Sequence, residues 1–435
     1  MALIPRYLMG NLDGVARVRA SRPGHDVTNS GLDPRFVAFD SSWRSALRWY
    51  AGGAITGSSL AGGVTTQNWI LSYGNGTYTY KRIDVPGISS STHTAIVLAK
   101  SNSSEAWYQC AAWIVNDQLR VCPYLANIGT AGALNQYTYY YWVFSVNPDT
   151  FDPVEDNLSN SMLFGVHPTR GAGIFVSRRG TDVLTAGDDD LVLSTQKNYF
   201  QFYETGTISR GVQSSANNQE LTVNLSTAYP DFPPIIAWRS NGGALGSYSP
   251  VVATWINSTT FRIRLSFTTT TAVVYRWGLI ACDPTYSGGV GTIKKPRVIA
   301  DASFGFGVTK KDIGYNEATQ TDWLFRSDRL PLYFRNYSEI TPNTFAPGLY
   351  NYPSDAQASV GAPFTMFRMN LGSSSWVGLG WVSTTAIRLP GTSPTPREWL
   401  TLLSSSETQY LLQKDSSVSF TGLTSYAGVA NVSDF

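Results

Sequence analysis

Apolar and polar residues alternate over short stretches along most of the chain. The stretches TFRIRLSF (260–267), ELTVNLS (220–226), TAIVLA (94–99) and TYTYKRIDV (77–85) alternate or are rich in β-branched and aromatic residues, and turn-forming residues separate them. Such a pattern predicts short β-strands. One stretch, TPREWLTLLSSSETQYLLQK from Thr395, fits either an amphipathic helix or two strands. The expected fold class is all-β, built from β-sandwich-like domains.

A short motif occurs twice with the same spacing. Its first copy has Ser21, Arg22, Gly24, Asp26 and Val27, and its second copy has Ser177, Arg178, Gly180, Asp182 and Val183, 156 residues later. A hydrophobic run follows each copy. A weaker third copy, FGVTKKDIGYNEATQTDWLFRSD, starts at Phe306; there Lys310 aligns with Arg178, and Asp312 aligns with Asp182 across a shortened glycine turn.

The segments that follow the three motifs also resemble one another. AAWIVNDQLRVCP from Ala111, ATWINSTTFRIRL from Ala253 and LGWVSTTAIRLPG from Leu379 each contain Trp, a β-branched residue, a polar turn and an alternating strand. The repeat length is therefore about 145 residues, long enough for an independent domain. We expect three tandem domains with related topology, at residues 1–155, 156–290 and 291–435, the first with an insertion.

The motif itself contains the residues of a tight turn between strands. Gly24 and Gly180 allow a positive φ, and Asp26 and Asp182 can accept hydrogen bonds from backbone amides. The motif is therefore predicted to be architectural. The alternative is that its basic residues bind an acidic group, such as a carboxylate of a neighbouring subunit, which arginine does with a bidentate fork.

The composition is typical of a folded chain with an uncharged surface. Hydrophobic residues make up 43% of the 435 residues, aromatic residues 13%, and charged residues only 14%. Typical soluble domains contain about 25% charged residues. A surface poor in charge and rich in Ser, Thr, Asn, Gly and Tyr suits packing against other subunits or binding of neutral polar ligands.

Charge and hydropathy exclude several function classes. The formal net charge is +2 and no long basic run is present, so the sequence gives no electrostatic signal of nucleic-acid binding. No apolar stretch approaches the roughly 20 residues of a membrane helix. The first residues, MALIPRYLMGNLDGVARVR, lack the apolar segment of a secretory signal. We therefore expect no membrane insertion, and synthesis in a cytoplasm.

Cysteine and histidine are too few for a disulfide framework or a zinc site. The chain has three cysteines, Cys110, Cys122 and Cys282, and three histidines, His25, His93 and His167. Cys110 and Cys122 flank an expected hairpin with the turn Asn116-Asp117. A disulfide between them is conceivable, but buried thiols fit a reducing compartment better. Zinc coordination by His and Cys is not expected.

The motifs resemble a known class of protein. The pairs ASRPGHDV with FDSS, and VSRRGTDV with VLS, each before a Gly- and Tyr-rich segment, are similar to tail-tip and tail-fibre structural proteins of tailed bacteriophages. This resemblance covers the three motifs best. It implies a virion protein of the tail that assembles as a homo-oligomer, with a trimer favoured because tail assemblies usually have threefold or sixfold symmetry, and that contacts other tail proteins. It brings no catalytic residues and no cofactor.

Enzyme motifs are not evident. Phage tails can carry glycan depolymerases, which use two carboxylates across a cleft, but no spacing singles out a pair among Asp231, Glu317 and Asp322. The sequence contains no nucleophile elbow, P-loop or His-Glu-x-x-His motif. Asp188, Asp189 and Asp190 could bind Ca²⁺, but they lack the loop pattern of an EF-hand and fit an exposed acidic turn better.

Tyrosine clusters leave open a role in glycan recognition. SYGNGTYTY from Ser72 places Tyr73, Tyr78 and Tyr80 in the expected insertion, where aromatic rings could stack on host surface sugars. Tyrosines in alternating strands are more often packed between domains. The sequence therefore predicts a non-enzymatic tail protein, with a receptor-binding module as the alternative and a depolymerase as a third reading.

Overall fold

The computed structural model describes most of the chain. The described residues are 7–21, 24–32, 37–40, 45–46, 48–65, 70–71, 78–89, 93–115, 117–123, 131–145, 162–177, 181–187, 191–194, 200–210, 219–240, 248–265, 273–286, 295, 297–301, 305–310, 312–326, 329–340, 348–351, 364–371, 374–381, 387–388, 400–404, 409–414 and 423–430. These residues form an all-β fold of antiparallel sheets, as the alternation predicts. Within them, no helix is long and apolar enough to span a membrane.

Three small sheets carry the repeated motif, and we call them head 1, head 2 and head 3. Head 1 contains β1 (Tyr7–Leu12), β2 (Val15–Ser21) and β3 (Val37–Asp40); head 2 contains β13 (Met162–His167), β14 (Gly171–Ser177) and β15 (Leu191–Ser194); head 3 contains β23 (Val298–Asp301), β24 (Gly305–Thr309) and β25 (Trp323–Arg326). In each head the three strands are paired in chain order. The first hairpin closes through Asp13 and Gly14, both with positive φ, as an Asp-Gly turn requires.

The same irregularity occurs at the same place in all three heads. The register between the second and third strands shifts directly before Ser21, Ser177 and Thr309. These three residues are fully buried, and each hydroxyl donates a hydrogen bond to the carbonyl four residues later. The three motif copies are therefore structurally equivalent.

This equivalence corrects the sequence alignment of the third copy. If Thr309 is equivalent to Ser177, then Gly314 occupies the position of Asp182, and Asp312 occupies the position of Gly180. Asp312 has a φ of +60°, close to the +85° of Gly24 in head 1. The glycine turn is thus not shortened: an aspartate adopts the left-handed conformation there, which Asp tolerates better than most residues.

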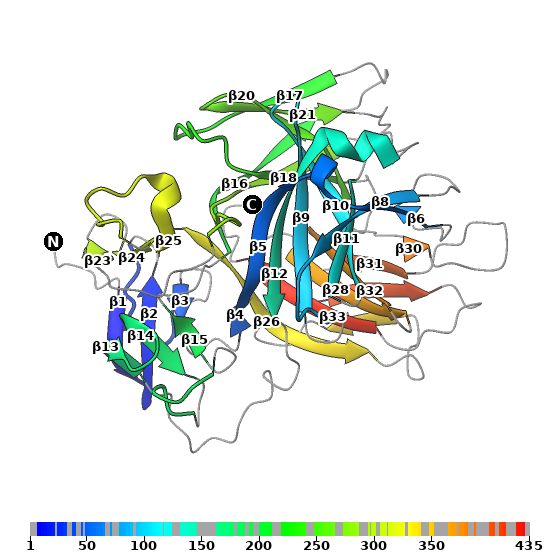
Figure 1. Ribbon diagram of the computed structural model, residues 1–435. Helices are drawn as coiled ribbons and strands as arrows, with labels where there is room; N and C mark the ends of the chain where they lie inside the picture. Colours follow the sequence, from blue (N-terminus) through cyan, green and yellow to red (C-terminus); the bar gives the residue numbers. More distant parts are fainter. Residues whose placement is uncertain are drawn as a thin grey trace.

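The three heads share one hydrophobic core. Val18 and Ala20 of head 1, Ile174 and Val176 of head 2, and Val308 and Phe325 of head 3 form a single buried cluster. Val18 and Ile174 occupy equivalent positions, as do Ala20, Val176 and Val308. Equivalent faces of three sheets therefore meet at a common centre, and Figure 1 shows the heads gathered on one side of the molecule.

The remaining strands form three larger units, which we call body 1, body 2 and body 3. Body 1 contains β4 (Ser45–Ala46), β5 (Arg48–Thr56), β6 (Gly62–Thr65), β7 (Ile70–Leu71), β8 (Tyr78–Asp84), β9 (His93–Ser101), β10 (Ala106–Val115), β11 (Gln118–Pro123) and β12 (Tyr137–Ser145), with 3₁₀ helices η2 (Gly57–Ser59) and η3 (Ala131–Gln136). Body 2 contains β16 (Gln201–Arg210), β17 (Gln219–Asn224), β18 (Ile235–Ser240), β19 (Tyr248–Pro250), β20 (Ala253–Asn257), β21 (Thr260–Leu265) and β22 (Val273–Ile280). Body 3 contains β26 (Leu330–Ile340), β27 (Gly348–Asn351), β28 (Phe364–Leu371), β29 (Ser374–Trp381), β30 (Ile387–Arg388), β31 (Leu400–Ser404), β32 (Gln409–Lys414) and β33 (Leu423–Ala430).

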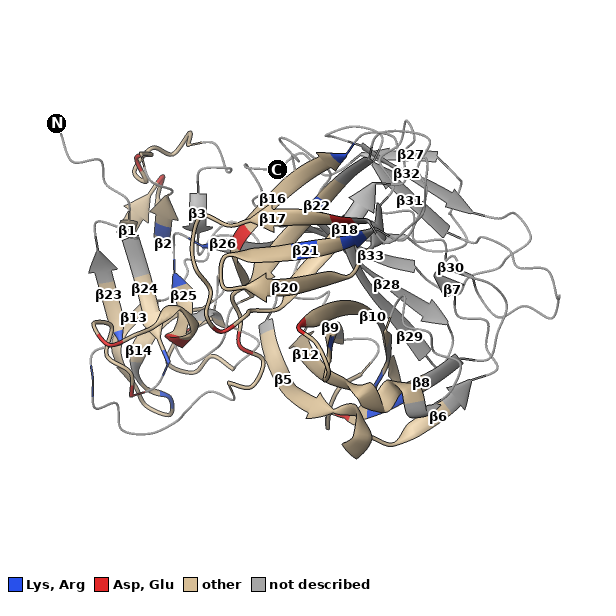
Figure 2. Cartoon of the chain, turned by 90° about the horizontal axis from the view of Figure 1, so that it is seen from above, with Lys and Arg blue, Asp and Glu red and all other residues tan. Residues whose placement is uncertain are grey.

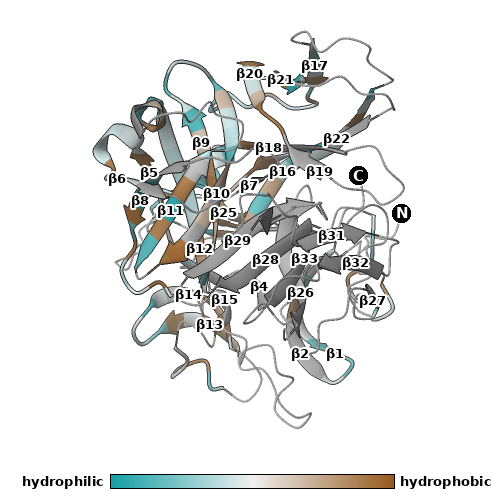
Figure 3. Ribbon diagram, turned by 90° about the vertical axis from the view of Figure 1, so that its right-hand side faces the viewer, coloured by the Kyte–Doolittle hydropathy of each residue, from teal (hydrophilic) through white to brown (hydrophobic). Residues whose placement is uncertain are grey.

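The bodies share a pairing scheme. In each, the last strand lies between the first long strand and a middle strand: β12 between β5 and β9, β22 between β16 and β18, and β33 between β26 and β28. The first strand has a bulge at the same place, where the register skips Tyr50, Tyr203 and Arg335. Figure 3 shows hydrophobic and hydrophilic residues alternating along body 1 strands such as β11.

Contacts between bodies follow a cyclic order. Phe202, directly before the bulge of body 2, pairs with Leu330, five residues before the bulge of body 3. Phe334, directly before the bulge of body 3, pairs with Ser45, five residues before the bulge of body 1. The same pairing thus leads from body 2 to body 3 and from body 3 back to body 1, as in a ring and unlike a linear array. The corresponding partner positions for body 1 lie outside the described residues.

Bodies 1 and 2 also share a core. A single cluster joins Trp142 and Phe144 of body 1 to Phe202 and Trp277 of body 2. Gln109 of body 1 donates a hydrogen bond to the carbonyl of Ala237 in body 2 at 2.8 Å. The expected division of the chain at residues 155 and 290 stays a prediction. The structure shows in addition that the three segments share sheets and cores. Figure 2 shows bodies 1 and 2 side by side.

Two local questions left open by the sequence are resolved. The stretch from Thr395 contains the paired strands β31 and β32 and no helix among its described residues. The hairpin of β10 and β11 has its turn at residues 116–117, as expected, because Val115 pairs with Gln118. In this register Ala111 lies opposite Cys122, so Cys110 belongs to the other face of the sheet. The register therefore does not favour the Cys110–Cys122 disulfide.

Candidate functional site

The aspartates of the first two motif copies stabilise the head turns. Asp26 accepts hydrogen bonds from the Thr28 amide at 2.8 Å and the Thr28 hydroxyl at 2.7 Å, and Asp182 accepts one from the Leu184 amide at 3.0 Å. The hydrogen bonds from Thr28 lower the pKa of Asp26. These contacts fit the architectural role predicted for the motif. Arg22, Arg178 and Gly180 lie outside the described residues.

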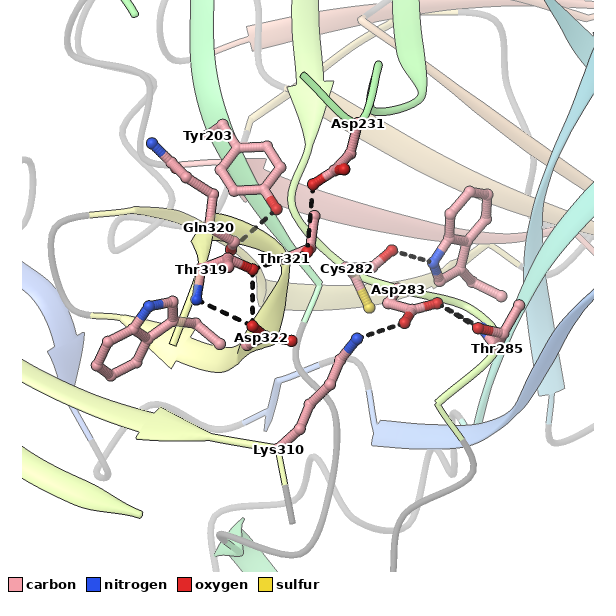
Figure 4. Close-up of polar contacts among 12 residues, drawn as sticks. Tyr203, Asp231, Cys282, Asp283, Thr285, Lys310, Thr319, Gln320, Thr321 and Asp322 are labelled. Carbon is pink, nitrogen blue, oxygen red and sulfur yellow. Dashed lines mark hydrogen bonds and ion pairs between the residues drawn. The ribbon is translucent and has the colours of Figure 1, made fainter. Parts of the chain in front are cut away.

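The basic residue of the third copy pairs with a carboxylate of the same chain. Lys310 Nζ lies 2.5 Å from Asp283 Oδ2, and their side chains are 16% and 31% exposed (Figure 4). Asp283 follows the last strand of body 2 and also accepts hydrogen bonds from the Thr285 amide and hydroxyl, at 2.9 and 2.6 Å. The ion pair therefore joins head 3 to body 2. In this copy, the basic residue of the motif binds an acidic group of the same chain, whereas the alternative named a carboxylate of a neighbouring subunit as an example.

The surroundings of Asp283 favour its charged form. Burial raises its pKa, but hydrogen bonds from Lys310 and Thr285 outweigh burial, and the resulting pKa lies below the ordinary value of a carboxyl group. The adjacent Cys282 is fully enclosed, and burial raises the pKa of its thiol well above the ordinary value. A thiol in this state is a poor nucleophile, because the thiolate is the reactive form.

We expect Asp283→Asn to destabilise the protein by about 1 kcal/mol at neutral pH, because the variant loses hydrogen bonds to a charged group. A lowered carboxyl pKa stabilises the fold above the unfolded-state pKa of about 3.9, and this contribution is lost as the pH falls through the folded-state pKa. Thermal midpoints measured from pH 7 to pH 3 should therefore differ between wild type and variant at high pH, and the difference should shrink as the pH falls below about 3.9.

Glu220→Gln is the matched control for this measurement. Glu220 forms an exposed ion pair with Arg262 on neighbouring strands of body 2, and exposed pairs contribute little. Its midpoint should follow that of the wild type at every pH. A constant difference between Asp283→Asn and wild type down to pH 3 would contradict a role for the charge of Asp283.

A second set of contacts holds head 3 against body 2. Arg329 donates to the Gln320 carbonyl at 2.5 Å and lies over the ring of Tyr203, 4.5 Å from its centroid. The Tyr203 hydroxyl donates to the same carbonyl at 3.1 Å. Burial raises the pKa of Tyr203, and Arg329 opposes this effect. Tyr203 is the bulged residue of body 2, so the bulge directs this ring onto the head.

The three carboxylates considered for glycan hydrolysis have other partners. Asp231 accepts a hydrogen bond from Thr321 at 3.4 Å, and Asp322 caps η6 (Gln320–Asp322) by accepting hydrogen bonds from the Thr319 amide and hydroxyl (Figure 4). Glu317 pairs with Lys295 at 2.5 Å. None of these contacts joins two of the three carboxylates directly, and the depolymerase alternative stays a prediction.

The structure describes only part of the tyrosine cluster. Tyr73 and the side chain of Tyr78 lie outside the described residues. Tyr80, in β8, is 8% exposed, and Arg120 lies over its ring, 5.0 Å from the centroid. A Cβ atom at Gly63, on the paired strand β6, would lie 2.4 Å from the ring. Tyr80 is therefore a packed residue, and its ring is not available to stack on a sugar.

Metal binding has no candidate in the described part of the chain. No group of three or more His, Cys, Asp or Glu side chains among these residues is placed to hold an ion. Asp188, Asp189 and Asp190 lie outside it. His167 is buried, with Nε2 3.0 Å from the Val183 carbonyl, and His93 accepts a hydrogen bond from the Ser89 amide. The partners of His167 lie within head 2, and that of His93 lies within body 1.

Sequence reasoning missed two features of this region. The first is the set of buried hydroxyls of Ser21, Ser177 and Thr309, which mark equivalent positions in the three heads. The sequence signal for them was a Ser or Thr at the same position at the start of each motif copy. Asp283 lies just before the expected boundary at residue 290 and was not predicted as a site residue, although Asn147-Pro148 and Asp283-Pro284 both come within a few residues of the last strands of bodies 1 and 2. Comparison with known proteins yields no match to a protein family, a curated protein or a solved structure.

Proposed function

We propose that the chain is a non-enzymatic structural protein of a bacteriophage tail, located at the tip or in a fibre. The observation that carries this proposal is the cyclic order of three equivalent copies within one chain. A ring of three equivalent units fits an axis of threefold or sixfold symmetry, which is what the resemblance to tail proteins implies. At the described junction, Lys310 pairs with Asp283 and Arg329 lies over the ring of Tyr203, and both are contacts between the second and third copies, as expected for a scaffold.

The proposal includes the virion as location and other tail proteins as partners. It also includes assembly of several chains, for which the resemblance favours a trimer. Because one chain already contains three copies, threefold symmetry does not require three chains. The number of chains in the particle therefore does not follow from the three copies within one chain.

Location in the virion is directly testable. Phage particles purified on a density gradient and washed at high salt should retain the chain, as measured by quantitative mass spectrometry against the major capsid protein. Cryo-electron microscopy of the tail should place it on the tail axis or in a fibre. A chain found only in the lysate, with particles that are intact without it, would refute the proposal.

The receptor-binding alternative stays a prediction. Tyr80 is not a suitable probe of it, because replacing a buried ring disturbs packing. The variants Tyr73→Ala and Tyr78→Ala should reduce adsorption to host cells without reducing particle yield if the alternative holds. Unchanged adsorption in both variants would leave the structural role as the better account.

A further inference from the structure

Among the side chains that the structure describes, the large apolar ones that are exposed lie mainly on the heads. Of the nine such residues among the described positions, seven belong to heads: Tyr7, Met9, Met162, Phe164, Val166, Leu184 and Tyr315. Five of the seven lie on β1 and β13, which are equivalent edge strands. Phe164 and Val166 are 71% and 73% exposed. Exposed apolar groups gathered in this way indicate a binding surface.

The five exposed side chains on β1 and β13 belong to the face that forms the shared head core. Met9 pairs with Val18, and Phe164 pairs with Ile174. Residues directly opposite each other in an antiparallel pair point to the same side of the sheet. Val18 and Ile174 are buried against the other heads, so Met9 and Phe164 continue the same interface beyond the part that is covered.

We propose that a second copy of the chain docks on this surface, with the heads of the two copies meeting tip to tip. The exposed apolar surface is an extension of the core in which the heads of one chain pack against one another through equivalent faces. The heads of a second copy have the same faces and could cover this surface. The hairpin turn of head 1 carries exposed Asp13, and that of head 2 carries half-buried Arg170, whose guanidinium also lies 3.3 Å from His167 Nε2. A twofold arrangement that sets head 1 against head 2 would bring these two turns of opposite charge near each other.

Sedimentation velocity of the purified full chain over a range of concentrations tests this proposal. Wild type should form dimers reversibly. Phe164→Asp and Met9→Asp should each weaken dimerisation at least about 30-fold, the loss expected for an apolar side chain at the centre of an interface. Both side chains are exposed, and circular dichroism and thermal melting should show that the variants remain folded.

Ile256→Asp is the matched control. Ile256 is also exposed, at 46%, but lies in β20 of body 2, and its replacement should leave dimerisation unchanged. A wild-type chain that stays monomeric at all concentrations, that forms trimers insensitive to Phe164→Asp, or that uses this face only for a different virion protein would overturn the proposal. None of these outcomes depends on whether the chain is found in virions.

Discussion

Replacing Trp142 with alanine should lower the free energy of unfolding by about 3–5 kcal/mol, the usual effect of removing a large buried aromatic side chain. Trp142 is fully buried in the core shared by bodies 1 and 2. Its ring packs edge to face on Phe200, with centroids 6.0 Å apart. Its indole nitrogen donates to the Cys282 carbonyl at 3.1 Å. The substitution therefore removes packing and a hydrogen bond between two bodies at once.

Trp142→Phe separates the two contributions. It retains most of the ring but leaves the Cys282 carbonyl without this donor, which should destabilise by about 1–3 kcal/mol. Chemical denaturation followed by intrinsic fluorescence and by circular dichroism would measure both variants. Because Trp142 itself contributes to the fluorescence, the stabilities of the variants are compared by the circular dichroism transition. If Trp142→Ala unfolds at the wild-type denaturant concentration, bodies 1 and 2 do not share a core.

The all-β fold could be predicted because its signal is local. Alternation in stretches such as 260–267 and Asp-Gly or Asn-Asp turns depend on neighbouring residues only, and β21 and the hairpin of β10 and β11 follow them closely. The stretch from Thr395 remained ambiguous because its apolar residues satisfy both periods. Two strands form there through pairing of β31 with β32 and of β32 with β27, which lies far away in the sequence.

The arrangement of the repeats could not be predicted, because it depends on contacts across hundreds of residues. The motif suggested three independent domains, whereas Val18, Ile174 and Val308 meet in one core. The alignment of Asp312 was wrong by two residues because the sequence comparison matched side-chain type. The backbone instead preserves the positive φ, which glycine supplies in head 1 and aspartate supplies in head 3.

The candidate site shows the same limit. Lys310 was chosen as a basic residue of the motif, but its partner Asp283 belongs to the preceding copy, and the two come together only because head 3 packs on body 2. For a related reason, the sequence could not show that Tyr80 of the tyrosine cluster is packed. A ring in an alternating strand can face either side, and Tyr80 faces Gly63 and Arg120.

Introducing a charge at Val176 should separate the heads. Val176 is fully buried in their shared core, between residues from all three copies. A carboxyl group placed there without a hydrogen-bond partner should lower the free energy of unfolding by about 2–7 kcal/mol even when it is neutral, and by more when it is ionised. Because the bodies have their own core, we expect the heads of Val176→Asp to become sensitive to protease while the bodies stay resistant.

Two comparisons make this prediction specific. Val308→Asp, at the equivalent position of head 3, should have the same effect, whereas Leu184→Asp, exposed on the turn of head 2, should be close to wild type. Burial raises the pKa of an introduced carboxyl, so its destabilising effect should decrease as the pH falls below that raised value and the group becomes neutral. If Val176→Asp leaves the protease resistance of the heads unchanged at neutral pH, the three copies do not meet at a common centre, and the cyclic arrangement on which the proposed function depends is wrong.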